Sequence, residues 1–348
     1  MSEARLPAGS GLPIVDVHAH VLLPALQAQA QQSDPEGFAA AAQLDLKRQG
    51  QESTAVSGRM IGERFERLTV LARRLADMDA TGVDLQVVSP SPSHFYPWAD
   101  RELAEQNARA ANRAVAELVA AAPERLVGLG LVAQQHPDLC PELLDDALGL
   151  GLAGVEISSF AQDVELSDPR LEAFWSRAEE TGALLFLHPF GCSLDERLDK
   201  FYLSNVVGQP AENAVALSHL IFGGVLDRHP RLKIVAAHGG GYLPTAIGRS
   251  DHAWHTRPDS RSCAEPPSSY LRRLWFDSLT HSPAQLAALV EAAGPSQVVV
   301  GSDYPFDMGA EEPLATVLAA DLGGEATEAI LRRNAAALLA GALERNPS

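Results

Sequence analysis

Short apolar runs rich in β-branched residues recur along the chain, and longer stretches with helical spacing of apolar residues separate them. Runs of this length and composition are typical of buried strands. Eight of them are predicted, at residues 14–18, 85–89, 126–131, 154–158, 184–188, 233–238, 274–278 and 297–302. Because strands alternate with helical stretches, the pattern indicates βαβ units and a parallel sheet.

Helices are predicted between these strands, most clearly at residues 65–79, 101–122 and 282–293, where Ala and Leu recur on one face. Eight strands with intervening helices favour an α/β fold of the (β/α)8 TIM-barrel type. A doubly wound open sheet is the alternative, since a count of strands does not establish closure.

The spacing of the strands is uneven in two places. We expect one domain over residues 1–348, with a barrel core at about 14–340 and insertions at about 21–64 and 190–213, after strands one and five. Long connections are commonly lids, binding loops or disordered segments. Both follow the carboxyl end of a strand, the face on which barrel enzymes build their active sites.

Composition narrows the class of protein further. The net charge of −18 disfavours nucleic-acid binding, and no apolar stretch is long enough to suggest a membrane span. The first residues lack the basic and apolar regions of a secretory signal, so a cytoplasmic location is expected. Cys140, Cys192 and Cys263 are widely spaced and odd in number, which favours buried structural thiols over disulfides or a thiolate zinc site.

Metal-competent side chains stand at the ends of four predicted strands. His18 and His20 are two residues apart, so alternation along a strand directs both side chains to the same side. His188, His238 and Asp303 each follow an apolar strand and precede a turn. If the barrel closes, these groups converge, and His18, His20, His188 and Asp303 form a donor set suited to Zn²⁺, with Mn²⁺ as the other candidate.

One titratable group near the metal must stay free to move protons. His238 is the candidate, because the glycines at 239–241 would let a substrate approach the backbone closely. The metal itself would lower the pKa of bound water and polarise a substrate oxygen. His238 and Asp303 are therefore the expected catalytic residues.

The strings HAH, HP, AHGGG and GSDYPF, in this order, resemble the branch of the amidohydrolase superfamily that is named for 2-amino-3-carboxymuconate-6-semialdehyde decarboxylase. The similarity runs from about residue 14 to 339. It implies a (β/α)8 barrel in which His18, His20, His188 and Asp303 bind zinc and His238 activates water or moves a proton. It also implies a homodimer in which Arg249 reaches the neighbouring site and binds a substrate carboxylate.

The chain departs from the family pattern at several positions. Phe190 and Gly191 follow the HP string where the decarboxylase has Trp-Asp, which implies a smaller aromatic wall. His94 is expected either at the substrate or at the surface, and Phe306 is expected to contact the substrate. A second substrate arginine would be Arg59 or Arg64.

The strand at 154–158 carries no lysine, so a two-metal site bridged by a carbamylated lysine is disfavoured and one metal is expected. Glu156 is interpreted as an inward side chain or a partner of a metal ligand. Other polar residues near strand ends are interpreted as pocket wall or supporting groups, namely Asp16, Asp277, His281 and Tyr304.

The resemblance favours non-oxidative decarboxylation of a small unsaturated or aromatic carboxylic acid. Hydrolysis or hydration, for example of a lactone or a ring-cleavage product, is the alternative on the same site, because metal-bound water can attack a carbonyl or an alkene. A non-catalytic metal-binding or regulatory protein is the remaining hypothesis.

Overall fold

The computed structural model describes residues 11–345, and ten strands lie in this part of the chain. Eight of them form one parallel sheet in the order β1-β2-β3-β4-β7-β8-β9-β10, and two short strands, β5 and β6, form an antiparallel pair beside it. The strands are β1 Val15–Val21, β2 Leu85–Pro90, β3 Leu126–Leu131, β4 Gly154–Ile157, β5 Phe160–Ala161, β6 Val164–Glu165, β7 Leu184–Leu187, β8 Lys233–Ala236, β9 Trp275–Asp277 and β10 Val298–Val299.

The sheet closes between its first and last strands. The Val17 N–H donates to the Val300 carbonyl at 2.8 Å, and Ala19 bridges in parallel to Tyr304. Closure confirms the predicted (β/α)8 barrel and excludes the doubly wound open sheet. All eight predicted strands are present, with ends that differ by a few residues.

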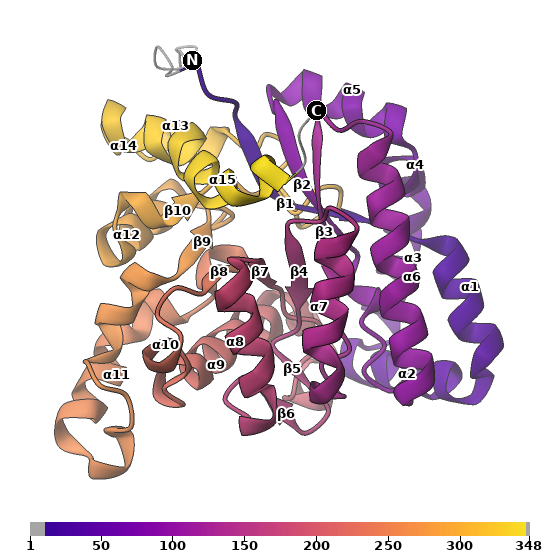
Figure 1. The fold of residues 1–348 in the computed structure, drawn as a ribbon, viewed down its shortest axis with the longest axis horizontal. Helices are drawn as coiled ribbons and strands as arrows, with labels where there is room; N and C mark the ends of the chain where they lie inside the picture. The colour runs from indigo at the N-terminus through magenta and orange to yellow at the C-terminus, as the bar shows by residue number, and fades with distance from the viewer. Residues whose placement is uncertain (1–10, 346–348) are drawn as a thin grey trace.

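Helices surround the barrel on all sides (Figure 1). They are α1 Pro24–Ser33, α2 Pro35–Gln49, α3 Gln51–Glu63, α4 Phe65–Thr69, α5 Leu71–Thr81, α6 Arg101–Ala120, α7 Cys140–Gly149, α8 Glu172–Thr181, α9 Gln209–Phe222, α10 Val225–Arg228, α11 Leu243–Thr256, α12 Pro283–Ala293, α13 Ala315–Ala319, α14 Gly324–Glu328 and α15 Asn334–Arg345. α6 begins at Arg101, as predicted for the helix over residues 101–122. The Asp100 side chain accepts from the Leu103 N–H and caps this end of the helix.

Two hydrophobic clusters hold the fold together. The larger packs the outer faces of the strands against the helices. The smaller fills the barrel interior, where Val15, Val17 and Phe186 pack with neighbours from other strands, and Leu338 and Leu339 of α15 contribute to it. Alternate strand residues therefore serve the two clusters, as the period of two along a strand requires.

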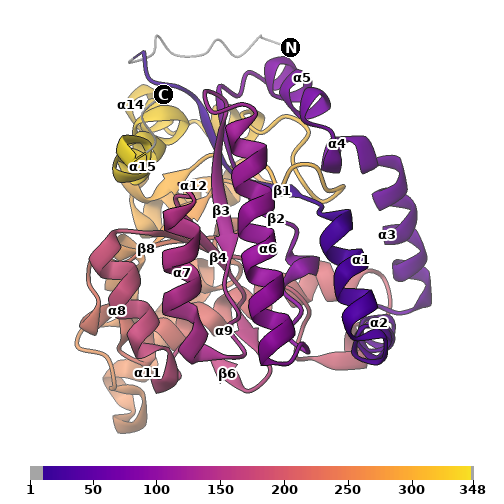
Figure 2. The same ribbon diagram turned by 45° about the vertical axis from the view of Figure 1, so that its right-hand side comes forward.

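The first insertion differs from the expected loop. Residues 24–63 form α1, α2 and α3, which stand together on one side of the molecule (Figure 2). α2 has no fully buried side chain, so its sequence lacks the periodic apolar positions that would have predicted a helix. The predicted helix over 65–79 is two helices, α4 and α5, which meet at the extended residue Val70.

Among the described residues no helix is both long and apolar enough to cross a membrane. The first ten residues, on which the prediction about a secretory signal rests, lie outside the described part of the chain.

Candidate active site

An irregularity in β1 aims the two histidines of the HAH string into the barrel mouth. Asp16 pairs with Gln86 of β2 and Ala19 with Val88, so β1 has one residue more than its partner between these pairs. Such a bulge re-aims the side chains that follow it. Val15 and Val17 therefore pack inside the barrel, and beyond the bulge His18 and His20 also face inward.

His18, His20 and Asp303 bring three electron-rich atoms together. Nε2 of His18 lies 3.1 Å from Nε2 of His20, and Oδ1 of Asp303 lies 3.3 and 3.2 Å from these two nitrogens. Nδ1 of His18 faces the Asp277 carboxylate at 2.6 Å and Nδ1 of His20 faces the Pro90 carbonyl at 3.4 Å. The Asp277 and Pro90 oxygens only accept, and the Ser89 hydroxyl, 3.1 Å from Nδ1 of His20, can accept as well. We therefore assign the proton of each ring to Nδ1, which leaves a lone pair on Nε2. This arrangement requires a cation, a proton or a metal ion, between the three atoms.

His188 decides between these cations. Its residue is 7% exposed and neither ring nitrogen has a hydrogen-bond partner among the described residues. A proton shared by His18, His20 and Asp303 would leave these nitrogens unpaired, at a cost of about 1–3 kcal/mol each. One donor atom from each of His18, His188, His238 and Asp303 lies within 4.8 Å of the others. These four residues form a candidate site for a divalent metal ion. The set contains His238 where the sequence indicated His20, and His20 lies directly against it.

Electrostatics prepares the same groups for a metal. Burial would raise the pKa of Asp303, but interactions with His18 and the neighbouring histidines hold it well below its ordinary value. Burial lowers the pKa of His188 well below its ordinary value, and nearby histidines lower it further. Burial would also lower the pKa of His18, but Asp303 and Asp277 raise it to about 10. A metal ion must therefore displace a proton from His18.

Asp277, at the end of β9, links three parts of the site. Besides accepting from His18, its carboxylate accepts from the backbone N–H groups of His238 at 2.9 Å and Gly239 at 2.8 Å. Burial would raise the pKa of this carboxyl, but the hydrogen bond from His18 lowers it. An acceptor of this kind fixes the tautomer and orientation of a metal-binding histidine. The sequence placed Asp277 near the site, and the structure adds what it contacts.

The glycines after His238 serve a different purpose from the one expected. A Cβ on Gly241 would lie 2.2 Å from the Pro210 carbonyl oxygen, and one on Gly240 would lie 2.7 Å from the Phe276 ring. Both glycines also have positive φ angles, 63° and 76°. They are needed for close packing and for this backbone conformation. The expectation that they make room for a substrate is wrong, because protein atoms already fill that space.

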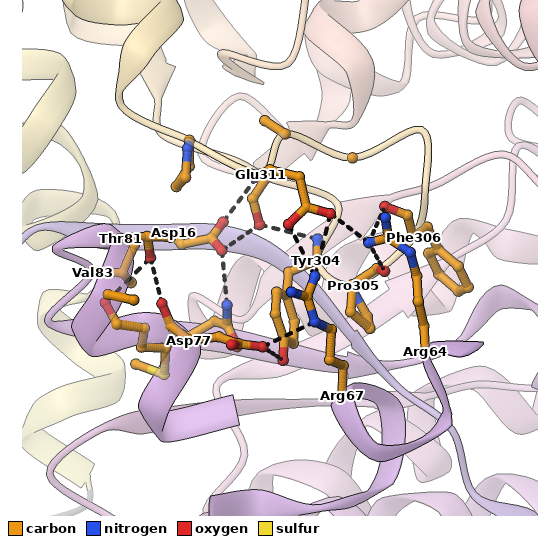
Figure 3. Close-up of a pocket in the computed structure, with 17 residues that line it drawn as sticks. Asp16, Arg64, Arg67, Asp77, Thr81, Val83, Tyr304, Pro305, Phe306 and Glu311 are labelled. Atoms are coloured by element: carbon orange, nitrogen blue, oxygen red, sulfur yellow. Dashed lines mark hydrogen bonds and ion pairs between the residues drawn. The ribbon is translucent and has the colours of Figure 1, made fainter. Parts of the chain in front are cut away.

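Polar residues around a pocket of about 200 Å³ hold the loop that carries Asp303 from behind (Figure 3). Asp16 accepts from the Ser302 N–H at 3.0 Å and from the Ser302 hydroxyl at 2.6 Å. Tyr304 donates to Asp77 of α5 at 2.9 Å. Figure 3 shows Arg64 reaching the same loop, where it donates to the Pro305 carbonyl at 2.8 Å. Asp16 and Tyr304 therefore support the site from outside it.

Glu156 on β4 is a buried carboxyl with an unusual environment. It is fully buried, and neither carboxyl oxygen has a hydrogen-bond partner in the described part of the chain. Oε1 lies 4.0 Å from Nδ1 of His20, whose other neighbour is the Ser89 hydroxyl at 3.1 Å. Burial raises the pKa of Glu156 well above its ordinary value. The residue is thus the inward side chain that was expected, and it lies behind a candidate metal ligand.

The predicted substrate contacts fall in different places. Phe306 lies 5.5 Å from the His20 ring, centroid to centroid, so it borders the site. Phe190 follows His188 by two residues and stacks edge-on with Phe95 at 6.5 Å. His94 is buried, and its Nε2 accepts from the Leu23 N–H at 3.0 Å while Nδ1 lies 3.1 Å from the Tyr96 hydroxyl. Both nitrogens of His94 are therefore engaged within the chain, and it does not lie at the surface.

The three candidate arginines are not equivalent. Arg59 and Arg249 are exposed. Arg64 is partly buried and pairs with Glu311 at 2.7 Å as well as with the loop carbonyls. Its guanidinium is thus occupied in holding the loop. Substrate binding by these arginines stays a prediction.

The remaining candidates have structural positions. Cys140, Cys192 and Cys263 are buried free thiols. His281, by contrast, is exposed.

The histidine and carboxylate cluster lies at the carboxyl ends of the barrel strands, where barrel enzymes have their active sites. This arrangement is typical of a metal-dependent barrel enzyme. The model of the amidohydrolase family matches residues 15–340, and the chain belongs to this family, in the group similar to 2-amino-3-carboxymuconate-6-semialdehyde decarboxylase. The resemblance predicted from the motifs is thereby confirmed.

Named relatives agree with this assignment. The chain is 37% identical over 239 residues to 2-amino-3-carboxymuconate-6-semialdehyde decarboxylase of Dictyostelium discoideum, which covers 68% of this chain and 67% of that protein. The crystal structure of 5-carboxyvanillate decarboxylase from Sphingomonas paucimobilis matches with a TM-score of 0.78 and 27% identity, over 94% of this chain and 99% of that one. The corresponding enzyme of Novosphingobium aromaticivorans, solved with bound manganese, has a TM-score of 0.81 at 21% identity, over 97% and 100% of the two chains.

Proposed function

We propose that this chain is a metal-dependent decarboxylase that releases carbon dioxide from an unsaturated or aromatic carboxylic acid without oxidation. The observation that carries the proposal is the cluster of His18, His20, His188 and Asp303 at the barrel mouth. Nε2 of His18 and of His20 lie 3.3 and 3.2 Å from Asp303, and neither ring nitrogen of His188 has a hydrogen-bond partner among the described residues. The named relatives are decarboxylases of acids of this kind.

His18, His20, His188 and Asp303 would hold one divalent ion. Imidazole and carboxylate donors suit Zn²⁺, and manganese is the ion bound in a related structure. When bound, such an ion acts as a Lewis acid on substrate oxygens. The donors themselves are fixed from behind, His18 by Asp277 and His20 by the Pro90 carbonyl and Ser89.

His238 is the proton carrier in this proposal. Its side chain is 18% exposed, whereas those of His18 and His20 are fully buried, so it has access to a substrate in the mouth. Nε2 lies 3.7 Å from Oδ2 of Asp303, and Nδ1 has no hydrogen-bond partner in the described part of the chain. With this nitrogen unpaired, His238 can take up or deliver a proton beside the metal donors.

Product analysis tests the reaction. The protein, loaded in turn with Zn²⁺ and Mn²⁺, is supplied with a panel of unsaturated and aromatic carboxylic acids, lactones and ring-cleavage products. Release of carbon dioxide with the carboxyl carbon lost from the product is expected. Products that have only gained water would establish the hydrolase or hydratase alternative. Stoichiometric metal without any turnover would favour a non-catalytic metal-binding protein.

A homodimer with shared sites is part of the proposal. Arg249 lies exposed on α11, and near the start of that helix the Tyr242 hydroxyl donates to the Val206 carbonyl at 3.4 Å, both residues exposing apolar surface. Arg249 would bind a substrate carboxylate in the neighbouring subunit. Mixing inactive Arg249→Ala and His238→Ala chains tests this, since a mixed dimer regains one complete site. About a quarter of wild-type activity is expected from random pairing, and no recovery would contradict sharing.

The cytoplasmic location stays a prediction. The absence of nucleic acid as a partner also stays a prediction.

A further inference from the structure

A large cavity adjoins the metal centre on the side of the barrel mouth formed by β2, β3, β4 and β7. Its volume is about 640 Å³, within the usual range of ligand pockets. Residues that follow these strands line one wall, and α2 of the first insertion lines the other. Since about 30 Å³ corresponds to one water in the liquid, the space equals roughly twenty waters, more than a single-ring acid fills.

The walls of this cavity are aromatic. Six of the lining residues are Phe38, Phe95, Tyr96, Trp98, Phe160 and Phe190. Phe38 stands edge-on to Trp98 at 6.2 Å, and Tyr96 lies 5.6 Å from Trp98, centroid to centroid. Rings set at these distances and angles form apolar surfaces that favour a further aromatic ring.

The cavity and the metal centre share one boundary. Phe190 and Gly191 line the cavity, and they follow the candidate ligand His188 by two and three residues in the sequence. Gly191 has no side chain, and Arg48 of α2 approaches to 3.6 Å from the position a Cβ would occupy. The cavity wall at Phe190 therefore lies two residues along the chain from a candidate metal ligand.

Polar and charged residues also line the cavity, among them Asp45 and Arg48 of α2. Gln134 follows β3 and is 5% exposed, and neither atom of its side-chain amide has a hydrogen-bond partner among the described residues. A buried amide without a partner is costly, so a polar substituent on a ligand would stabilise it. Ser158, after β4, is another polar residue of the wall.

We infer that this cavity binds an aryl extension of the substrate, so that the substrate is a carboxylic acid with a second aromatic ring. The acid end lies at the metal centre, which rests on the proposed function, and the second ring packs against the aromatic surface to which Phe38, Tyr96 and Trp98 contribute. A hydrogen-bonding substituent on that ring meets Gln134.

Binding of inert acids to the metal-loaded protein tests the cavity separately from catalysis. Benzoate and the 3- and 4-phenylbenzoates are compared by calorimetry. Burial of the second ring is expected to make at least one phenylbenzoate bind about tenfold or more tightly than benzoate. Equal affinities for all three acids would overturn the inference.

A matched pair of substitutions on α2 locates the effect. Ala41 lines the cavity, whereas Ala39 is exposed on the same helix and does not. Ala41→Trp fills the space and is expected to remove the advantage of phenylbenzoate while leaving benzoate within about twofold. Ala39→Trp should change neither affinity and controls for folding. If both variants behave alike, the second ring does not lie in this cavity.

The polar contact has its own test. Gln134→Leu should weaken a phenylbenzoate that carries a hydroxyl on the second ring by about tenfold, and leave the unsubstituted probe unchanged. An equal loss for both probes would overturn the role of Gln134.

The outcomes separate the two proposals. Carbon dioxide release from simple acids, together with no preference for the second ring, would overturn the cavity assignment and leave the proposed function standing. A preference for phenylbenzoate that Ala41→Trp removes, without decarboxylation of any acid, would overturn the proposed function and leave the cavity assignment standing.

Discussion

The two sides of the barrel mouth are built in different ways. On the metal side the functional atoms stand on strands or within a few residues of a strand end, and hydrogen bonds fix several of them from behind, as Asp277 fixes His18. On the cavity side the walls come from loops and from α2, a helix with no fully buried side chain. The difference teaches that the chain uses the sheet where atoms must be placed accurately, and loops and an inserted helix where only a shape is needed.

Substitution of two histidines on the metal side gives the largest expected effect and tests the division of roles. His238→Gln should lower kcat roughly a hundredfold to ten-thousandfold and leave the metal content unchanged, because His238 is proposed to carry protons. His20→Gln should lower the metal content itself. Metal analysis and kinetics on both variants check this. Loss of metal from His238→Gln with retention in His20→Gln would show that His238 is the ligand and His20 is not.

Acid should weaken the connection between the two sides through His94, which joins the Leu23 backbone to Tyr96 of the cavity wall. Burial lowers its pKa from 6.5 to about 4. The neutral form is therefore favoured by folding, so its contribution is complete above about pH 6.5 and is lost as the pH falls toward 4. A shift of this size corresponds to roughly 3 kcal/mol.

Denaturant unfolding at pH 7 and pH 4.5 measures this loss. His94→Gln should be less stable at pH 7 and should show a smaller decrease on acidification than the wild type. An unchanged pH dependence in the variant would assign the acid sensitivity to other groups.

Glu156→Gln sharpens the comparison within the metal side. Loss of the carboxyl group behind His20 is expected to weaken metal binding about tenfold to a hundredfold, as substitutions behind metal ligands commonly do. The metal-free protein should be no less stable, because a buried carboxyl without a hydrogen-bond partner is removed. Competition with a chelator and thermal unfolding measure the two quantities. Unchanged metal affinity would make Glu156 irrelevant to the site.

Arg64→Ala should have the smallest effect. It removes the hydrogen bond to the Pro305 carbonyl, and a loss of about 1 kcal/mol in the free energy of unfolding is expected, with little change in the affinity for carboxylates. Arg59→Ala, at an exposed position, is the control and should change neither. A large rise in KM for the acid in Arg64→Ala, at unchanged stability, would restore its role as a substrate residue.

Local pattern was sufficient to predict the barrel and the metal cluster. Runs such as Leu184–Leu187 are short, apolar and followed by a metal-competent residue, and both features are visible within a few positions. The bulge in β1 is different, because it depends on pairing with β2 and cannot be seen in the alternation of β1 alone. Without it the strand would point either the valines or the histidines away from the interior.

The cavity could not be predicted from the sequence for a related reason. Phe38 and Trp98 are sixty residues apart and meet only because α2 folds over the barrel mouth. The first helices of the first insertion, α1 and α2, contain Gln and Ala without a strong apolar face. The sequence therefore did not predict them as helices, and the segment was interpreted as a long connection. The engaged nitrogens of His94 also depend on partners that the local pattern does not reveal.

The metal centre lies on the seam where the barrel closes. The Asp303 N–H donates to the His18 carbonyl at 2.9 Å, and the His20 N–H donates to the Tyr304 carbonyl at 2.7 Å, so the first and last strands meet at the ligands themselves. His18 leaves the ribosome almost three hundred residues before Asp303. A nascent chain therefore holds its histidines without their carboxylate until Asp303 has been synthesised, so the complete metal site forms only after the strands of the barrel have been made.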